Sequence, residues 1–174
     1  MPNEKPNTPT GLDVSARVEL MDIRIIKSAF EQTPEVNRGR KNVDINRKVN
    51  LQVDKEKNLL FVVIDFDLKA SVEGASSPVI TITASFLLVY KLQDFSGLTD
   101  ESYRSFAEIN AVFNAWPYWR EYVQNITVRM GLPSLTIPVF RIAKSSDKES
   151  NKDSIAKKVK SKSVAKKSVE KTKV

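Results

Sequence analysis

The sequence of 174 residues predicts an α+β domain: a four-stranded antiparallel sheet comes first, and two C-terminal helices then pack on one face of it. Two observations support this prediction. Apolar and polar residues alternate through most of the stretch from residue 16 to residue 93, and this period of two is typical of half-buried strands. After residue 99 apolar residues recur every three or four positions, as they do along one face of a helix.

The first strand is predicted over residues 16–32, where the alternation slips at Met21–Ile23 and again at Ile25–Ile26. Either a β-bulge or burial on both faces would explain the slip. Residues 33–46 are too polar for a strand and are predicted to form a surface crossover loop. The first strand is therefore expected to be irregular and separated from the other strands by a long connection.

Three further strands are predicted to form a meander, because each is joined to the next by a short turn-forming segment. These strands run through residues 47–53, 58–73 and 79–93, with turns at 54–58 and 74–78. In the two long strands the even-numbered positions form an uninterrupted apolar series, so these positions are expected to face the core.

The two helices are predicted over residues 100–113 and 117–130. Thr99 is a suitable N-cap for the first helix, and Pro117 suits the first position of the second. Gly131 is expected to end the second helix. Two prolines then require residues 132–140 to continue as an extended segment, at a sheet edge or across a helix.

Charge divides the chain into a neutral part and a basic tail. Residues 144–174 contain 11 lysines and 4 acidic residues, whereas residues 1–143 contain 17 basic and 17 acidic residues. The tail has too little apolar surface to offset its ordering entropy. We therefore predict a flexible N-terminus over 1–13, an α+β domain over 14–143 and a disordered lysine-rich tail over 144–174. The tail is either a polybasic arm for nucleic acid, ribosomes or anionic lipid, or a solvating extension.

The composition excludes most catalytic chemistry. The chain has no cysteine and no histidine, which removes disulfides, thiolate and imidazole catalysis and the usual transition-metal sites. Asp65 and Asp67 form a carboxylate pair, but no partner base and no phosphate-binding glycine loop accompany them. We predict no enzyme activity, catalytic residue, metal or cofactor. With no apolar run long enough to span a bilayer and no signal peptide, the chain is expected to be cytoplasmic.

Aromatic residues gather around a proline in the segment "NAVFNAWPYWREYVQNI", residues 110–126. Trp116, Tyr118, Trp119 and Tyr122 point in several directions around one helical turn, so they cannot all face one sheet. A second subunit or a bound ligand is expected to cover the remainder.

The same segment resembles the hallmark segment of the SecB family of export chaperones. The family pattern at the start of the last helix is an aromatic residue, proline, tyrosine, a basic and an acidic residue, matched here by Trp116, Pro117, Tyr118, Arg120 and Glu121. The glycine, prolines and leucine that follow in the family are matched by Gly131, Pro133, Leu135 and Pro138. A weaker similarity extends back to about residue 17 and includes "SAFE" at residues 28–31.

This resemblance implies an ATP-independent chaperone that holds unfolded polypeptides in hydrophobic grooves. It also implies a tetramer, built as a dimer of dimers with an eight-stranded sheet in each dimer. The expected partners are unfolded or precursor proteins, delivered for protein export to the SecA motor ATPase. The alternative within the family is a chaperone dedicated to a toxin–antitoxin module. The alternative from another class is a nucleic-acid-binding protein that acts through the basic tail.

The resemblance also indicates candidate site residues. The groove would be bounded by the crossover loop, the second helix and the extended segment, with candidate contacts at Phe30, Val36, Val43, Ile45, Trp116, Trp119, Tyr122, Leu135, Ile137 and Phe140. Candidates for a translocase-docking face are Asp65, Asp67 and Glu73. Members of the family present a negative sheet face to SecA, whereas residues 1–143 carry no net charge. This departure weighs against docking to SecA.

Overall fold

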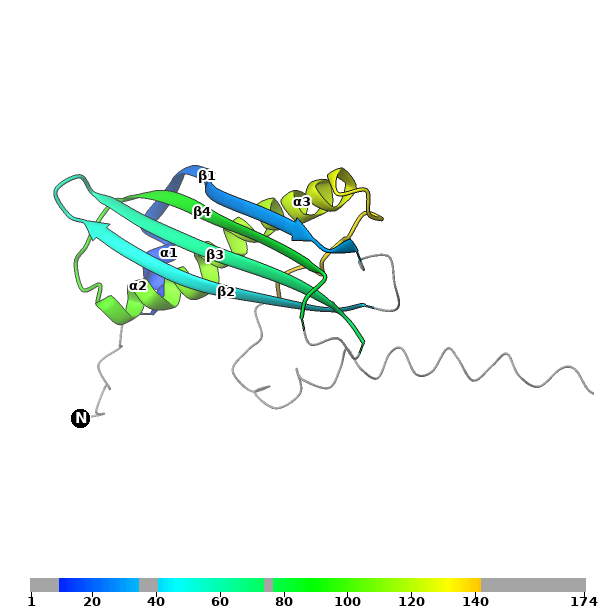
Figure 1. Ribbon diagram of the computed structural model, residues 1–174. Helices are drawn as coiled ribbons and strands as arrows, with labels where there is room; N and C mark the ends of the chain where they lie inside the picture. Colours follow the sequence, from blue (N-terminus) through cyan, green and yellow to red (C-terminus); the bar gives the residue numbers. More distant parts are fainter. Residues whose placement is uncertain (1–9, 35–40, 74–76, 142–174) are drawn as a thin grey trace, which may run out of the picture. The chain divides into compact units, whose positions relative to one another are not determined.

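Four strands precede the helices in the computed structural model, which describes residues 10–34, 41–73 and 77–141 (Figure 1). In chain order the elements are α1 (Gly11–Ser15), β1 (Val18–Gln32), β2 (Lys41–Asp54), β3 (Leu59–Val72), β4 (Ile80–Leu92), α2 (Asp100–Phe106), the π-helical turn η2 (Ala107–Ala111) and α3 (Val112–Arg129). The predicted α+β class is confirmed. Val36 and the predicted domain boundary after residue 143 lie outside the described residues.

The four described strands form one antiparallel sheet in the order β1-β4-β3-β2. Strands β2, β3 and β4 follow one another as the predicted meander, and β1 pairs with β4. Strands β1 and β2 are therefore the two edges of the sheet (Figure 1). In the central strands β3 and β4 every second side chain is buried, as the period of two predicts.

Strand β2 begins earlier than expected. The prediction of a crossover loop up to residue 46 is wrong, because residues 41–46 pair with β3. In this stretch Val43 and Ile45 stand opposite buried residues of β3, and the residues between them are polar. An edge strand tolerates these polar residues, since they face the solvated side of the sheet. High polarity indicated an edge strand here, not a loop.

The alternation of β1 slips because the strand contains two bulges. Its register against β4 shifts once at Met21 and again at Ile26, each of which is an extra residue without a direct partner on β4. Met21 is 57% exposed and Ile26 is 52% exposed. The prediction of a bulge is confirmed, and the alternative of burial on both faces is wrong.

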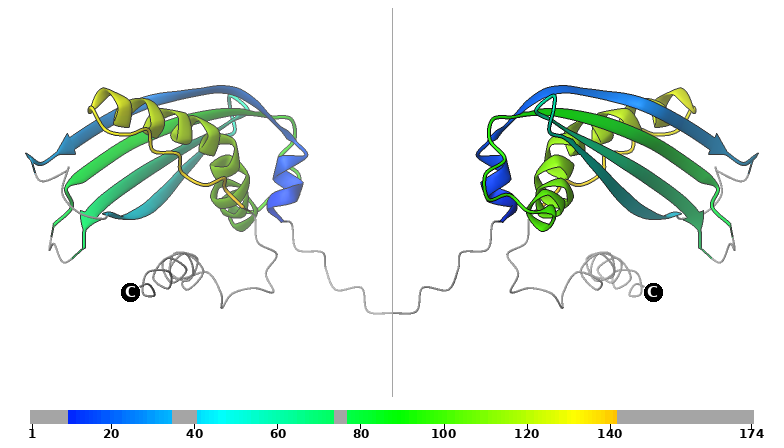
Figure 2. Two further views of the ribbon diagram at one scale, coloured as in Figure 1. Left: turned by 90° about the vertical axis from the view of Figure 1, so that its right-hand side faces the viewer. Right: turned by 90° about the vertical axis from the view of Figure 1, so that its left-hand side faces the viewer.

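The core lies between the sheet and the helices, on the side toward which the sheet curves (Figure 2). Its sheet layer consists of the even-numbered residues of β3 and β4, as predicted, and these side chains are nearly or fully buried except for the half-buried Val72. The helical layer comes from α2, η2 and α3, whose buried residues include Phe106, Ala111, Ala115, Trp119 and Val123. Burial of this apolar surface is the main source of stability, at roughly 25 cal/mol per Å².

Elements α2, η2 and α3 follow one another without a break, so the prediction of two separate helices is wrong. Pro117 lies inside α3 and not at a helix start. An internal proline costs about 3 kcal/mol, but the buried residues Ala115 and Trp119 on either side of it hold the helix against the sheet. The predicted N-cap is confirmed, since Ser102 N–H donates to Thr99 Oγ1 at 3.2 Å. No described helix combines the length and apolar character that a membrane span requires.

Helix α1 includes residues 11–13, the last part of the segment predicted to be a flexible N-terminus. Val14 is fully buried in the core. Gly11 permits the close approach of α1 to α2, because a Cβ atom at this position would lie 2.7 Å from the backbone nitrogen of Phe106. One helical turn is too short to show a period, so the sequence pattern gives no signal for this helix.

Candidate functional site

Helix α3 ends in a turn that sends the chain back along the helix. Gly131 has a φ of +72°, a conformation that L side chains rarely adopt. Its N–H donates to the Val128 carbonyl, and Leu132 N–H donates to the Thr127 carbonyl, both at 3.0 Å. These are the two hydrogen bonds of a Schellman motif, so the predicted helix end at Gly131 is confirmed. Residues 132–140, the return segment, then run back beside α3 (Figure 2).

Side chains of α3 hold the backbone of the return segment. Leu135 N–H donates to Thr127 Oγ1 (3.1 Å), Arg120 Nε donates to the Ile137 carbonyl (2.9 Å), and Trp116 Nε1 donates to the Pro138 carbonyl (2.8 Å). The three helical positions differ by four and seven, so they lie on one face of α3. The prediction that this segment lies extended across a helix is therefore the alternative that the structure supports.

Apolar side chains of the return segment pack into the core beside these hydrogen bonds. Ile137 is 2% exposed, and Leu135 and Phe140 are half-buried against the core. Thr136 and Val139 point to solvent, and Val139 is 56% exposed. The segment thus packs apolar side chains against the core while its backbone groups bind α3.

Three aromatic residues of α3, Trp116, Trp119 and Tyr122, form one cluster with Phe66 of β3 and Phe140 of the return segment. The Trp119 ring stacks on Phe66 with centroids 5.2 Å apart, and the Trp116 ring meets Phe66 edge-on at 5.7 Å. Phe140 lies 5.5 Å from Trp116, and Tyr122 lies 6.0 Å from Trp119. The return segment therefore covers part of the aromatic surface for which the sequence predicts a second subunit or a ligand.

The structure separates the predicted groove residues into three places. Six lie in or beside the aromatic cluster: Trp116, Trp119, Tyr122, Leu135, Ile137 and Phe140. Among these six, Trp119 and Ile137 are buried, and the others are half-buried. Ile45 and Val43 lie on β2, where Ile45 is half-buried and Val43 is 42% exposed. Phe30 lies on β1, at the opposite edge of the sheet, and is 51% exposed.

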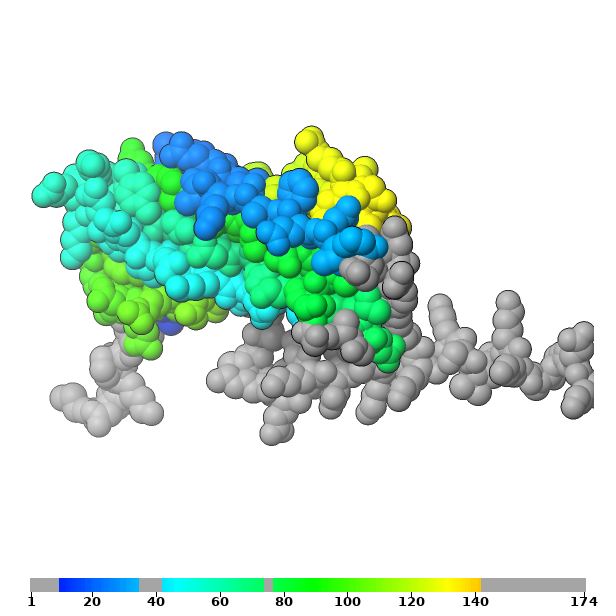
Figure 3. Space-filling model, viewed as in Figure 1, coloured from blue at the N-terminus to red at the C-terminus, as the bar shows by residue number. Residues whose placement is uncertain are grey.

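The predicted site included only one residue, Phe30, of an exposed apolar surface on β1. We call it the β1 apolar edge, and it consists of Leu20, Met21, Ile25, Ile26 and Phe30, each at least 40% exposed. Three of the five, Leu20, Ile25 and Phe30, stand opposite buried residues of β4 and so point to the helix side of the sheet. Figure 3 shows the side chains of this strand, in blue, at the surface. The slips in the alternation were the available sequence signal.

The solvent-facing side of the sheet carries both signs of charge at the predicted docking residues. Asp65 accepts a hydrogen bond from Ser85 Oγ at 2.6 Å, and Asp67 forms an ion pair with Lys69 at 3.0 Å. A hollow of about 500 Å³ on this side is lined by these two aspartates together with Lys27 and Lys48, among others. Acidic and basic groups therefore alternate here, in line with the charge balance of residues 1–143.

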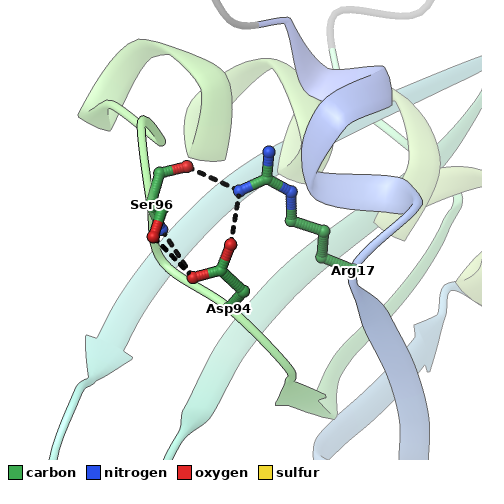
Figure 4. A network of polar contacts seen from close by, with 3 residues as sticks. All are labelled: Arg17, Asp94 and Ser96. Carbon is green, nitrogen blue, oxygen red and sulfur yellow. Dashed lines mark hydrogen bonds and ion pairs between the residues drawn. The ribbon is translucent and has the colours of Figure 1, made fainter.

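A polar network fixes the beginning of β1 (Figure 4). Arg17 Nη1 donates to Asp94 Oδ2 at 3.3 Å and to the Ser96 carbonyl at 2.6 Å. The N–H and hydroxyl of Ser96 donate to Asp94 Oδ1 at 2.9 and 2.8 Å. These two bonds from Ser96, with a smaller effect of Arg17, lower the pKa of the Asp94 carboxyl. The network joins β1 to the connection between β4 and α2.

Acidic groups are not gathered into a cation site in the part of the chain that the structure describes. Within residues 10–34, 41–73 and 77–141, no group of three or more acidic side chains could hold a metal ion.

The strongest pKa shift belongs to Tyr90, because burial raises its pKa to about 12. Asn114 Nδ2 donates to its hydroxyl oxygen at 3.0 Å. Tyr90 lies in the core and not at a surface cleft, so this shift has a structural origin.

Comparisons with known proteins support the resemblance found in the sequence. No protein-family model matches the chain. The chain is 28% identical over 148 residues to the SecB-like chaperone MT2006 of Mycobacterium tuberculosis (strain CDC 1551 / Oshkosh), covering 75% of this chain and 81% of that protein. Its fold matches that of the Mycobacterium tuberculosis Rv1957 SecB-like chaperone, solved in complex with a ChAD peptide from the Rv1956 HigA1 antitoxin. That match has a TM-score of 0.66 and 24% identity, and covers 75% of this chain and 96% of the other.

These findings define the class first by fold: the chain has the SecB-like α+β fold, as predicted. The sequence similarity to a SecB-like chaperone adds further support, because it extends well beyond the hallmark segment. The chain is therefore similar to SecB-like chaperones both in fold and in sequence.

Proposed function

We propose that the protein is an ATP-independent chaperone that holds unfolded polypeptides on apolar surface. One observation carries this proposal: a SecB-like chain leaves the β1 apolar edge uncovered, together with Phe113, Tyr118 and Val128 of α3. Such a set of large exposed side chains marks a surface that binds another chain. An unfolded polypeptide offers the complementary chemistry, since it presents apolar side chains and unpaired backbone groups.

The energetics favour weak binding of each short segment. Burying about 1000 Å² of apolar surface would contribute about 25 kcal/mol before costs, at roughly 25 cal/mol per Å². The ordering of a flexible client and its loss of overall freedom offset most of this gain. A long client that contacts several copies of the surface would bind more tightly through avidity. This behaviour suits a protein that holds clients and then releases them.

We further propose a homo-oligomer, with a tetramer built from symmetric dimers as the most specific form. The exposed edge of β1 supports this, because an apolar edge strand is a ready site for pairing with a second copy. Part of the uncovered surface would then be an interface, and the rest would remain for clients.

The test is suppression of aggregation of an unrelated unfolded protein in the absence of ATP. We expect full-length protein to suppress aggregation and Phe30→Ser to suppress it less. Leu12→Ser is the matched control, since Leu12 is 74% exposed but lies on α1, away from the β1 apolar edge. Wild-type protein that fails to delay aggregation at any ratio would contradict the proposed function, and a native mass spectrum dominated by monomer would contradict the tetramer.

Two cellular settings fit such a chaperone. The Rv1957 chaperone was solved with a peptide from an antitoxin, which supports an antitoxin as the dedicated client of this chain as well. Protein export, with delivery to SecA, is the other setting, and Asp65, Asp67 and Glu73 would form its docking face. The lysines that neighbour the two aspartates favour the antitoxin setting over export. Identification of clients that copurify from cells, combined with a direct SecA binding assay, separates the two.

A cytoplasmic location is proposed for either setting. The alternative of nucleic-acid binding through the lysine-rich tail stays a prediction, because residues 144–174 lie outside the described residues. Truncation of this tail should leave client holding unchanged and remove any salt-sensitive binding to a polyanion.

A further inference from the structure

The return segment is bound to α3 in the manner of an extended peptide ligand. Residues 133–140 have no regular secondary structure, and after the helix-ending hydrogen bond of Leu132 the backbone of the segment is held by side chains of the helix. Between residues 133 and 140, two carbonyls and one N–H group bind side chains of α3, and the apolar side chains at positions 135, 137 and 140 pack on the core. A chaperone surface that accepts extended apolar chains would use these same elements.

We propose that Trp116, Arg120 and Thr127 form a recognition site for one extended apolar segment, and that the return segment occupies this site and competes with clients. The proposal rests on the chaperone function proposed above and names one of its binding sites. The occupant is an extended polypeptide whose sequence resembles the chain's own Leu135-Thr-Ile137-Pro-Val-Phe140.

The hydrogen-bond pattern specifies what the site reads. Thr127 Oγ1 requires an N–H at the position of Leu135, so a client cannot have proline there. At the position of Pro138 only the carbonyl is used, so proline and other residues are equally acceptable. Apolar side chains are required at positions 135, 137 and 140, whereas position 139 faces solvent. The site is therefore tolerant in side chains and strict in backbone register.

Competition follows because a client segment would replace contacts of the same kind. The apparent affinity for a client equals the affinity of the empty site multiplied by the fraction of molecules in which the return segment has left the site. A change that weakens binding of the return segment to the site without altering α3 should therefore tighten client binding. A change on α3 should weaken binding of the return segment and binding of the client alike.

The experiment measures binding of a fluorescent peptide with the sequence of residues 132–140 to full-length protein by anisotropy. We expect Leu135→Pro protein to bind the peptide about tenfold more tightly than wild type, since its own segment can no longer donate to Thr127. Leu135→Ala, a milder change, should act in the same direction if the first variant does not fold. Val139→Ala is the matched control in the same segment and should leave the affinity unchanged.

Peptide variants test the register. A peptide with Leu135→Pro should lose binding to the freed site, whereas a peptide with Pro138→Ala should retain it. Equal or weaker peptide binding by folded Leu135→Pro and Leu135→Ala proteins would overturn the proposal, as would equal binding of both peptide variants. Aggregation suppression by wild-type protein, measured in parallel, keeps this outcome distinct from failure of the chaperone function itself.

Discussion

Strands β3 and β1 both pair with β4 along its length, yet they differ completely in side-chain burial. Every second residue of β3 is buried, whereas no residue of β1 is. Ile64 on β3 and Ile25 on β1 stand on either side of Phe86, and Ile64 is 0% exposed while Ile25 is 44% exposed. Hydrogen-bonded pairing with β4 therefore holds β1 in place although none of its side chains is fully buried, and Val18 and Ile23 pack only partly against the core.

The reason for this difference is the width of the helical layer. An α-helix with its side chains is about 10 Å wide, which covers roughly two strands spaced about 4.8 Å apart. Helix α3 lies over the central strands, and the return segment, whose Phe140 lies under the Arg47 guanidinium, extends the cover toward β2. On the β1 side, this cover leaves Leu20, Ile25 and Phe30 at least 40% exposed. The β1 apolar edge is therefore the surface that remains for a partner.

The largest loss of stability is expected from a change in the buried region. Trp119 is fully buried and stacks on Phe66, so Trp119→Ala should lower the free energy of unfolding by about 3 to 5 kcal/mol. Tyr118→Ala is the matched control on the same helix, because Tyr118 is 47% exposed, and its effect should be within about 0.5 kcal/mol. Denaturant unfolding measures both. Similar losses for the two variants would show that position on α3, and not burial, decides stability.

The buried side of the molecule was the most predictable from sequence. The even-numbered residues of β3 and β4 have a clear period of two, and burial enforces that period because a slip by one residue would expose every apolar side chain. The N-cap at Thr99 and the helix end at Gly131 were predictable for the same reason, since few residue types satisfy those backbone groups.

The edges and the site were less predictable, because tertiary contacts decide them. Pro117 is a typical first residue of a helix, but packing of α3 on the sheet overrides that preference. The polar residues before Arg47 resemble a loop, although they complete an edge strand. The aromatic residues around Pro117 were expected to need an external partner, and the return segment supplies part of that cover. No local sequence pattern shows that residues 132–140 fold back onto α3.

A second prediction concerns Tyr90, which lies on the buried side. Burial raises its pKa from 10.0 to about 12, so the folded state disfavours the ionised phenol. Ionisation of Tyr90 leaves the free energy of unfolding unchanged below pH 10. As the pH rises from 10 to about 12, the unfolded state ionises first, and the free energy of unfolding falls by about 2 to 3 kcal/mol in total. Denaturant unfolding at several alkaline pH values measures this loss. Tyr90→Phe cannot ionise, so its stability should fall less steeply, and equal slopes would assign the loss to other groups.

A third prediction concerns the exposed edge. Ile26 is an extra residue at a bulge and is 52% exposed. Ile26→Ser should therefore change the free energy of unfolding of the monomer by less than about 0.5 kcal/mol. The same change should reduce self-association or client holding, because it places a hydroxyl in the β1 apolar edge. Native mass spectrometry and the aggregation assay measure these effects. A stable variant that retains both properties would show that the β1 apolar edge binds no partner.

The smallest expected effect concerns the polar network that fixes the start of β1. Asp94→Asn keeps the shape of the side chain but removes the charge that Arg17 and the Ser96 N–H contact. Because these contacts lower the pKa of Asp94, they stabilise the fold above the usual pKa of aspartate, and the stabilisation is lost as the pH falls through the lowered value. Asp94 is exposed, so screening by solvent keeps the effect below those of the changes at Trp119 and Tyr90.

The measurement for Asp94 is the difference in unfolding midpoint between wild type and Asp94→Asn at neutral pH and in acid. The wild type should be slightly more stable at pH 7, and the difference should disappear once the carboxyl is protonated, because the two side chains then both lack charge. Hydrogen exchange at the first residues of β1 should rise in the variant, since the partner of Arg17 loses its charge while the ladder to β4 remains. A difference that persists unchanged in acid would mean that the carboxylate charge has no role and that backbone pairing with β4 alone holds the edge strand.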